Sequence, residues 1–296
     1  MKTKFLLIGM FFLSIFTFTN CNSDSTPATT DTALTVNEVA STQTMDNAID
    51  DVSVIADDQY ELTEGTANGR VSASTYFSLT PSCATISDLG STSTVRKITI
   101  TFGTATTSCL FRGHHLRGQI ILTRTISTTF PKIMTVTYND FYINDNKIEG
   151  TSTWKRDMLG TGTTLHPKTA FTMANMTLTT KEGVVYTRNG ERIREMTDGF
   201  STRTSPTDDV FSTWGTFTTT SSNGNVYSSS IKADTPLINK TSCSLLQTPS
   251  PFPVSGILKL SKNSHYVTID YGTGDCDNLA MLSIDGGVAV QITLKD

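Results

Sequence analysis

Few side chains in this 296-residue chain have types and spacing suited to metal chemistry. His114 and His115 are adjacent, and neighbouring residues of a strand point to opposite faces, so sharing a metal would require a loop. We expect a solvent-exposed loop pair instead. The acidic segment 270–278 does not match the EF-hand pattern with its placed glycine and distal glutamate. It surrounds Cys276, and Asp and Asn residues around a disulfide are typical of turns. The sequence predicts no metal site and no cofactor.

Catalysis is not predicted either. The Gly-x-Ser-x-Gly elbow of serine hydrolases does not occur in the sequence. Four glutamates could in principle supply a glycosidase pair, although their contexts are typical of exposed β surface: Glu149, Glu182, Glu191 and Glu195. Five aromatic residues could stack on sugars, although alternating tryptophans more often fill a core: Trp154, Trp214, Tyr138, Tyr142 and Phe217. We therefore predict a non-enzymatic protein with no catalytic residues.

The five cysteines are the reactive residues that the sequence constrains most. Cys83, Cys109, Cys243 and Cys276 form no CxxC pair and have no histidine at zinc spacing. In an exported chain such an even number indicates two disulfides, for which three connectivities exist. The fifth, Cys21, stands apart from them at the end of an N-terminal apolar segment.

The N-terminus has the pattern of an export signal. Lys2 and Lys4 precede an apolar run, 5–18, that is too short to span a bilayer comfortably. We therefore predict a signal peptide over residues 1–20. Its removal leaves 21 basic against 27 acidic residues, a net charge of −6. The basic residues are not clustered, so nucleic-acid binding is not expected.

The segment Phe18-Thr19-Asn20-Cys21 resembles the lipobox of bacterial lipoproteins. The resemblance implies that Cys21 carries diacylglycerol and becomes the mature N-terminus. Phe18 and Asn20 depart from the usual leucine and small residue, a looseness expected of Bacteroidetes. The alternative is an ordinary secretory signal followed by a chance cysteine. Lipidation on Cys21 predicts anchoring to the outer membrane, facing either the cell surface or the periplasm.

The segment 21–34 is predicted to be a flexible tether. It is rich in Ser, Thr, Asn, Asp and Pro. Asp24-Ser25-Thr26 and Asp31-Thr32-Ala33 resemble the O-glycosylation sequon of Bacteroidetes, which makes Ser25 and Thr32 candidate modification sites. A chance match in a Ser/Thr-rich segment is the alternative.

The rest of the chain predicts one helix followed by a sheet. Apolar residues recur at steps of three and four over 35–58, and the aspartates fall mostly on the other face. We therefore expect an amphipathic helix that packs its apolar stripe on the sheet.

From residue 59 onward apolar and polar residues alternate, as in 71–79 and 98–102, which is the pattern of β-strands. Turn signals such as 144–146, 181–183 and Asn189-Gly190 separate the runs. We predict a single all-β domain over 59–296, an antiparallel meander of about a dozen strands forming an open or partly closed barrel or sandwich.

An internal echo between 83–122 and 243–284 predicts the disulfide pairing. Residues 98–104 match 267–273 by residue type, and each copy has one cysteine before and one after. The simplest arrangement gives both copies the same bridge, Cys83–Cys109 and Cys243–Cys276. Four free thiols are the alternative, which an oxidising compartment disfavours.

These motifs also resemble a family of Bacteroidetes surface lipoproteins. The resemblance rests on segments 102–118, 147–151, 208–211 and, most specifically, 269–278. Segment 110–115 departs from the family pattern because it is more apolar and richer in histidine. The resemblance implies an outer-membrane lipoprotein but supplies no activity.

Two functions of different classes follow from these expectations. The first is a non-catalytic surface protein that binds glycan or protein through its β face. The second is a periplasm-facing carrier or chaperone that encloses an amphipathic ligand between the helix and an unclosed sheet. An apolar cavity of several hundred Å3 under the helix would favour the carrier, and a filled interior would oppose it.

Overall fold

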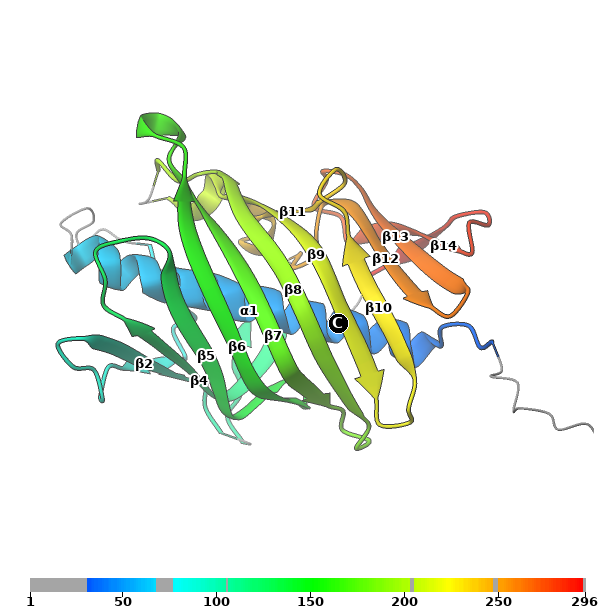
Figure 1. The fold of residues 1–296 in the computed structure, drawn as a ribbon, viewed down its shortest axis with the longest axis horizontal. Helices are drawn as coiled ribbons and strands as arrows, with labels where there is room; N and C mark the ends of the chain where they lie inside the picture. Colours follow the sequence, from blue (N-terminus) through cyan, green and yellow to red (C-terminus); the bar gives the residue numbers. More distant parts are fainter. Residues whose placement is uncertain (1–30, 68–76, 105, 203–204, 247–249, 295–296) are drawn as a thin grey trace, which may run out of the picture. The chain divides into compact units, whose positions relative to one another are not determined.

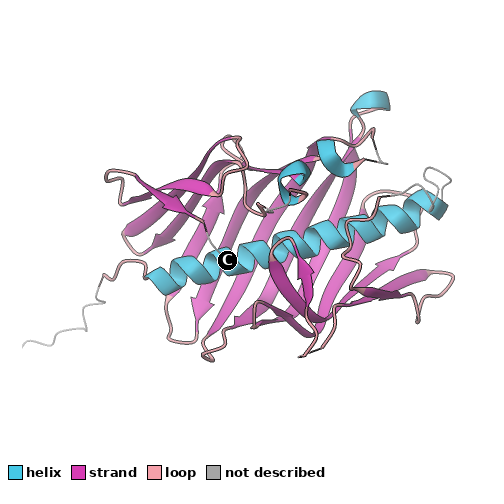
Figure 2. Cartoon of the chain, turned by 180° about the vertical axis from the view of Figure 1, so that it is seen from behind, coloured by secondary structure: helices cyan, strands magenta, loops and turns pink. Residues whose placement is uncertain are grey.

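The fold is organised around one long helix. A computed structural model of the chain describes residues 31–67, 77–104, 106–202, 205–246 and 250–294. Helix α1 (Val36–Ala67) lies across one face of a 15-stranded antiparallel sheet (Figures 1 and 2). It begins with a capping box, because the Glu38 carboxylate accepts from the Thr35 backbone N–H at 2.8 Å while the Thr35 hydroxyl accepts from the Glu38 N–H at 3.2 Å.

The strands follow the predicted meander almost in chain order. They are β1 (Thr85–Ser87), β2 (Val95–Thr101), β3 (Cys109–Phe111), β4 (His114–Thr125), β5 (Lys132–Ile143), β6 (Asn146–Leu159), β7 (His166–Thr179), β8 (Val185–Asp198), β9 (Val210–Ser221), β10 (Val226–Ile231), β11 (Leu237–Lys240), β12 (Ser255–Lys262), β13 (His265–Thr273), β14 (Leu279–Ile284) and β15 (Val290–Thr293). Short helices are α2 (Thr241–Ser244), η1 (Gly162–Thr164) and η2 (Pro206–Asp208).

The sheet runs from edge strand β1 to edge strand β15. Strand β3 pairs with β4 alone, and β10 and β11 lie in one row between β9 and β12. The sheet curves around α1 and is partly closed (Figure 2). The all-β prediction with one N-terminal helix is therefore confirmed.

Alternation along the strands decides which side chains meet α1. In β6, Ser152, Trp154 and Arg156 are buried while Thr151, Thr153 and Lys155 are exposed. The inner residues of the central strands and the apolar residues of α1, such as Val52 and Ile55, form one core cluster. A second cluster lies over β10–β14 around Leu260 and Ile269.

Glycines with positive φ bend the strands where they must curve. Gly118 (φ 84°) lies at a bulge between β4 and β5, where an added Cβ would lie 1.9 Å from the Asp140 carbonyl oxygen. The segment Asn189-Gly190, predicted to be a turn, instead lies inside β8. There Gly190 (φ 133°) lets β9 approach, since a Cβ would lie 2.3 Å from the Thr216 carbonyl oxygen. The turn prediction was wrong because glycine also serves close strand contacts.

The helix is longer than the predicted 35–58. It continues through residues 59–67, which had been assigned to the sheet, because Glu61 and Glu64 pair with Arg156 and Arg124 of the sheet. Of the predicted strand 71–79, residues 71–76 lie outside the described part of the chain, and 77–79 form no strand. Tertiary ion pairs thus extended α1 past the point where its apolar period fades.

The aspartates of α1 do not face solvent as predicted. Asp51 and Asp58 are 1% and 3% exposed. The Asp58 carboxylate accepts from the Leu79 N–H at 2.8 Å and the Ser78 and Thr80 hydroxyls at 2.7 Å each. The helix is therefore packed on more than one side. Within the described residues no helix is long and apolar enough to cross a membrane.

Candidate functional site: a charged seam under the helix and a cavity beside it

Acidic residues of α1 meet basic residues of the inner sheet face in a row of ion pairs, here called the charged seam. Its acidic members are Glu38, Asp46, Asp57, Glu61 and Glu64. Its basic members are Arg124, Arg156, Arg188, Arg192, Arg194 and Lys262. All six basic side chains are at most 8% exposed. The concave face thus holds the helix by charge as well as by apolar packing.

Strand β8 supplies three of these cations from one face. Arg188, Arg192 and Arg194 are separated by even numbers of residues, so all three point toward α1. Their guanidinium groups lie over aromatic rings: Arg188 and Arg192 are 5.1 and 4.6 Å from the Phe217 ring centre, and Arg194 is 3.5 Å from that of Phe211. These cation–π contacts partly replace the water lost on burial.

Two carboxylates of the seam each form ion pairs with two guanidinium groups. Asp46 binds Arg188 and, at 2.9 Å, Arg192. Asp57 lies 2.7 Å from Arg156 and 2.5 Å from Arg194. Burial lowers the pKa of both Arg192 and Arg194, an effect that Asp46 and Asp57 respectively oppose. Among the described residues, neither of these two arginines has a partner for its Nε–H.

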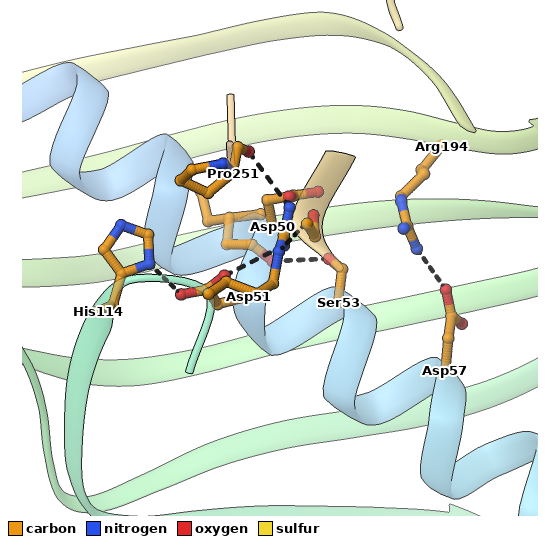
Figure 3. Close-up of polar contacts among 10 residues, drawn as sticks. Asp50, Asp51, Ser53, Asp57, His114, Arg194 and Pro251 are labelled. Carbon is orange, nitrogen blue, oxygen red and sulfur yellow. Dashed lines mark hydrogen bonds and ion pairs between the residues drawn. The ribbon is translucent and has the colours of Figure 1, made fainter. Parts of the chain in front are cut away.

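A second polar cluster ties α1 to the β3–β4 hairpin (Figure 3). Arg112 (φ 52°) and Gly113 (φ 96°) form the two-residue turn of this hairpin. The Arg112 guanidinium donates to Asp50 at 2.7 Å, to Asp51 at 3.1 Å, to the Ser244 hydroxyl at 3.0 Å and to the Pro251 carbonyl at 3.2 Å. One side chain therefore joins α1, the hairpin and the segment that follows β11.

The Asp51 carboxylate also pairs with His114 at the start of β4. The Asp51 Oδ2 to His114 Nδ1 distance is 2.5 Å, and both side chains are buried. Burial raises the pKa of Asp51 against the opposing effects of His114 and Arg112. The predicted exposed loop pair is wrong for His114, because strand alternation turns it inward while His115 stays exposed. Nearby, the Ser53 hydroxyl donates to the Ile49 carbonyl at 2.7 Å, so it is not aligned as a nucleophile for His114.

Beside α1 lies a cavity of about 280 Å3, here called the side cavity. Its walls come from α1, the 77–81 segment, β3, β8, β9, β11 and the residues around α2. They carry three cations, Arg112, Arg194 and Lys240, against one carboxylate, Asp50. Two cavities of about 60 Å3 also have Arg194 in their walls. The described cavities between α1 and the sheet are smaller: the two of about 60 Å3, and one of about 10 Å3 among residues such as Val52 and Met173, which has room for about one water molecule.

The outer sheet face carries a row of hydroxyl side chains. Directly opposed residues on successive strands form it, with Glu191 of β8 inserted, and we call it the hydroxyl row: Thr123, Thr135, Thr153, Thr172, Thr216 and Ser230. Neighbouring members are expected about 4.7–4.9 Å apart in the pairing direction. Beside this row, other outward-facing hydroxyl residues are directly opposed on neighbouring strands: Thr137 with Thr151, and Thr218 with Ser228. The row is thus a regularly spaced set of hydroxyl groups interrupted by one carboxylate, Glu191, and it continues into Lys97 at one end and Lys259 at the other.

Both predicted disulfides are present. Cys83 joins Cys109 and Cys243 joins Cys276, with Cα separations of 5.6 and 5.4 Å. The echo strands β2 and β13 each pair antiparallel with the strand that follows in the repeat, β4 and β14. Gly103 follows β2 and Gly272 lies near the end of β13, with φ of 101° and 89°. The two copies thus share a bridged cysteine pair and an antiparallel strand pair, but only the first has an extra strand, β3, between its two strands.

The other residues singled out by sequence are scattered. Cys21 and Ser25 lie outside the described residues, and Thr32 is exposed with its carbonyl accepting from Asn263 at 3.4 Å. Trp154 and Phe217 are buried, so the five aromatics form no outer platform. The four glutamates lie apart: Glu149 pairs with Lys147, Glu191 with Thr172 and Glu195 with His166, while Glu182 is on the β7–β8 turn.

The charged seam was missed by sequence reasoning. Its signal was the even spacing of Arg188, Arg192 and Arg194, which places three cations on one face of a strand, but the predicted turn at Asn189-Gly190 separated Arg188 from the other two. Across the described ranges, no three His, Cys, Asp or Glu side chains gather as metal ligands would. Comparisons with protein-family models, with curated proteins and with solved structures found no match.

Proposed function

We propose that this protein is a lipid-anchored, non-catalytic binding protein of the outer membrane or cell surface that contacts an extended glycan through its outer sheet face. The hydroxyl row carries this proposal. Its hydroxyl members repeat from strand to strand and offer both donors and acceptors, with one carboxylate, Glu191, among them. A polymer of hydroxyl-bearing units is the partner that such a repeating row of hydroxyl groups suits best.

The arrangement of α1 supports a binding surface over an internal cargo site. The helix occupies the concave face, where a carrier would hold its ligand, and the described cavities between it and the sheet are small. The ion pairs of the seam join α1 to β4, β6, β8 and β12. Opening the concave face would leave those buried charges without partners, at a cost of about 3–5 kcal/mol for each broken pair. A carrier that encloses its ligand between α1 and the sheet would need more space than the described cavities there, of about 10 and 60 Å3, provide.

A glycan array tests the proposal. The mature chain with Cys21→Ser should bind one or more neutral glycans, and the double variant Thr153→Lys/Thr216→Lys should lose at least tenfold in affinity because both exposed side chains would block the row. Thr94→Lys/Thr129→Lys adds the same charge on exposed loops and should bind as the parent does. Binding confined to proteins, or equal loss in both double variants, would contradict a glycan function of this face.

A further inference from the structure

The side cavity has an opening lined by exposed apolar side chains. Phe77, Leu110 and Leu245 belong to its walls and are 52%, 59% and 42% exposed. They come from three separate parts of the chain, the 77–81 segment, β3 and the residues after α2. Large apolar side chains that gather around one opening mark ligand or partner sites more often than chance exposure does. The mouth of the cavity is therefore suited to a hydrocarbon group.

The inner wall of the cavity has the opposite chemistry. Arg194 is 5% exposed, and it also lines the two smaller cavities. Within the described part of the chain its ion pair is with Asp57, a carboxylate that Arg156 also binds. No described residue accepts a hydrogen bond from its Nε–H. A buried guanidinium with a shared counter-charge and an unused donor is a site where an added anion would be stabilised.

The remaining charges of the wall favour an anion as well. Asp50 is held by Arg112, and Lys240 donates to the Gly274 carbonyl at 2.8 Å rather than to Asp50. The volume of about 280 Å3 lies at the lower end of the range for small-molecule sites. That size accommodates one short alkyl chain and excludes a two-chain lipid.

We propose that the side cavity binds a single-chain anionic amphiphile, a medium-chain carboxylate, with its head at Arg194 and its chain against Phe77, Leu110 and Leu245. This site is separate from the outer hydroxyl row and does not depend on the proposed glycan function. Arg194 supplies a charge-assisted hydrogen bond to the carboxylate, and the exposed apolar residues at the mouth cover the chain.

Calorimetric titration of the mature chain with Cys21→Ser tests the site with three probes: decanoate, decanol and acetate. Decanoate should bind, whereas decanol, with the same chain but no charge, should bind about tenfold or more weakly. Acetate, which lacks the chain, should give no measurable heat. Equal affinity for decanol and decanoate, or no binding of decanoate, would overturn the proposal.

Variants separate the head from the chain. Arg194→Gln should weaken decanoate about tenfold or more and leave decanol unchanged, whereas Lys155→Gln, which removes an exposed cation from the outer face, should alter neither. Leu110→Ser/Leu245→Ser should weaken both probes, and because these side chains are exposed the variant should melt as the parent does. Ile133→Ser is the matched apolar control, 46% exposed on β5. Should Arg194→Gln fail to fold, the Leu110/Leu245 variant decides: unchanged decanoate affinity there would refute the site.

Discussion

At the scale of single residues, this fold depends on buried charges that are shared. Asp46 and Asp57 each serve two arginines, and Arg112 binds two aspartates while also reaching Ser244 and Pro251. Such networks are weak evidence for net stability, because desolvation offsets their attraction. Removing one partner, however, leaves a buried charge uncompensated. Each member of the seam is therefore sensitive to substitution.

The pair of Glu38 and Lys262 gives a pH-dependent test. Both side chains are at most 4% exposed, and their shortest contact is 2.8 Å. Burial alone would raise the pKa of Glu38, but hydrogen bonds from Lys262 and the Thr35 backbone outweigh it and hold the pKa below 4.5. The ionised Glu38 therefore stabilises the fold above pH 4.5, and this contribution is lost as the pH falls through the lowered pKa.

We accordingly expect Glu38→Gln to lower the free energy of unfolding by about 3–5 kcal/mol at pH 7. The deficit should shrink as the pH is lowered below 4.5, in urea unfolding followed by circular dichroism. Glu149→Gln, in an exposed pair with Lys147, should cost less than about 1 kcal/mol. A deficit that is the same at pH 7 and pH 3 would show that ionisation of Glu38 is not its cause.

At the scale of elements, the two disulfides lie in the segments that contact α1 through Arg112, namely the β3–β4 hairpin and α2. Cys109 lies in β3, next to the hairpin turn that carries Arg112, and Cys243 precedes Ser244, which accepts from Arg112. The bridges thus restrain both sides of one guanidinium contact. Their sequence separations are 26 and 33 residues.

Replacing Cys83 and Cys109 together by serine should reduce the free energy of unfolding by roughly 3–4 kcal/mol, the chain-entropy value for a loop of that length. The Cys243→Ser/Cys276→Ser variant should lose a similar amount. Non-reducing peptide mapping of the parent should recover both linked peptide pairs. Alkylation of all four thiols without reductant would overturn the assignment of both bridges.

At the scale of the whole molecule, the two faces of the sheet differ in what covers them. The inner face is occupied by α1, and the outer face presents the hydroxyl row. A lipid at Cys21, beyond a polar tether, would leave the folded part free to turn either face toward a partner. Anchoring and binding are then separable properties of one chain.

The anchor is tested in cells. Cys21→Ser should move the protein from the membrane fraction to soluble fractions or leave the signal peptide attached, because the thioether to diacylglycerol cannot form. Detergent-phase partitioning and electrophoretic mobility measure the change, with Cys83→Ser/Cys109→Ser as a control that should stay lipidated. Partitioning unaffected by Cys21→Ser would refute the lipid attachment.

What the sequence by itself determined are the features with local causes. The alternation of strand residues, the turn at Asn144-Asp145 and the paired cysteines of the echo could be predicted, because each depends on residues close in the chain or on an internal copy. Only the tertiary structure decided where charged groups lie. Asp51, His114 and Arg194 are buried because oppositely charged partners distant in sequence pair with them. Helix α1 extends to Ala67 because Glu61 and Glu64, in its last turns, form ion pairs with Arg156 and Arg124 of the sheet. Hydropathy assigns such residues to solvent, since the cost of burying a charge is set by the partner and not by the residue alone.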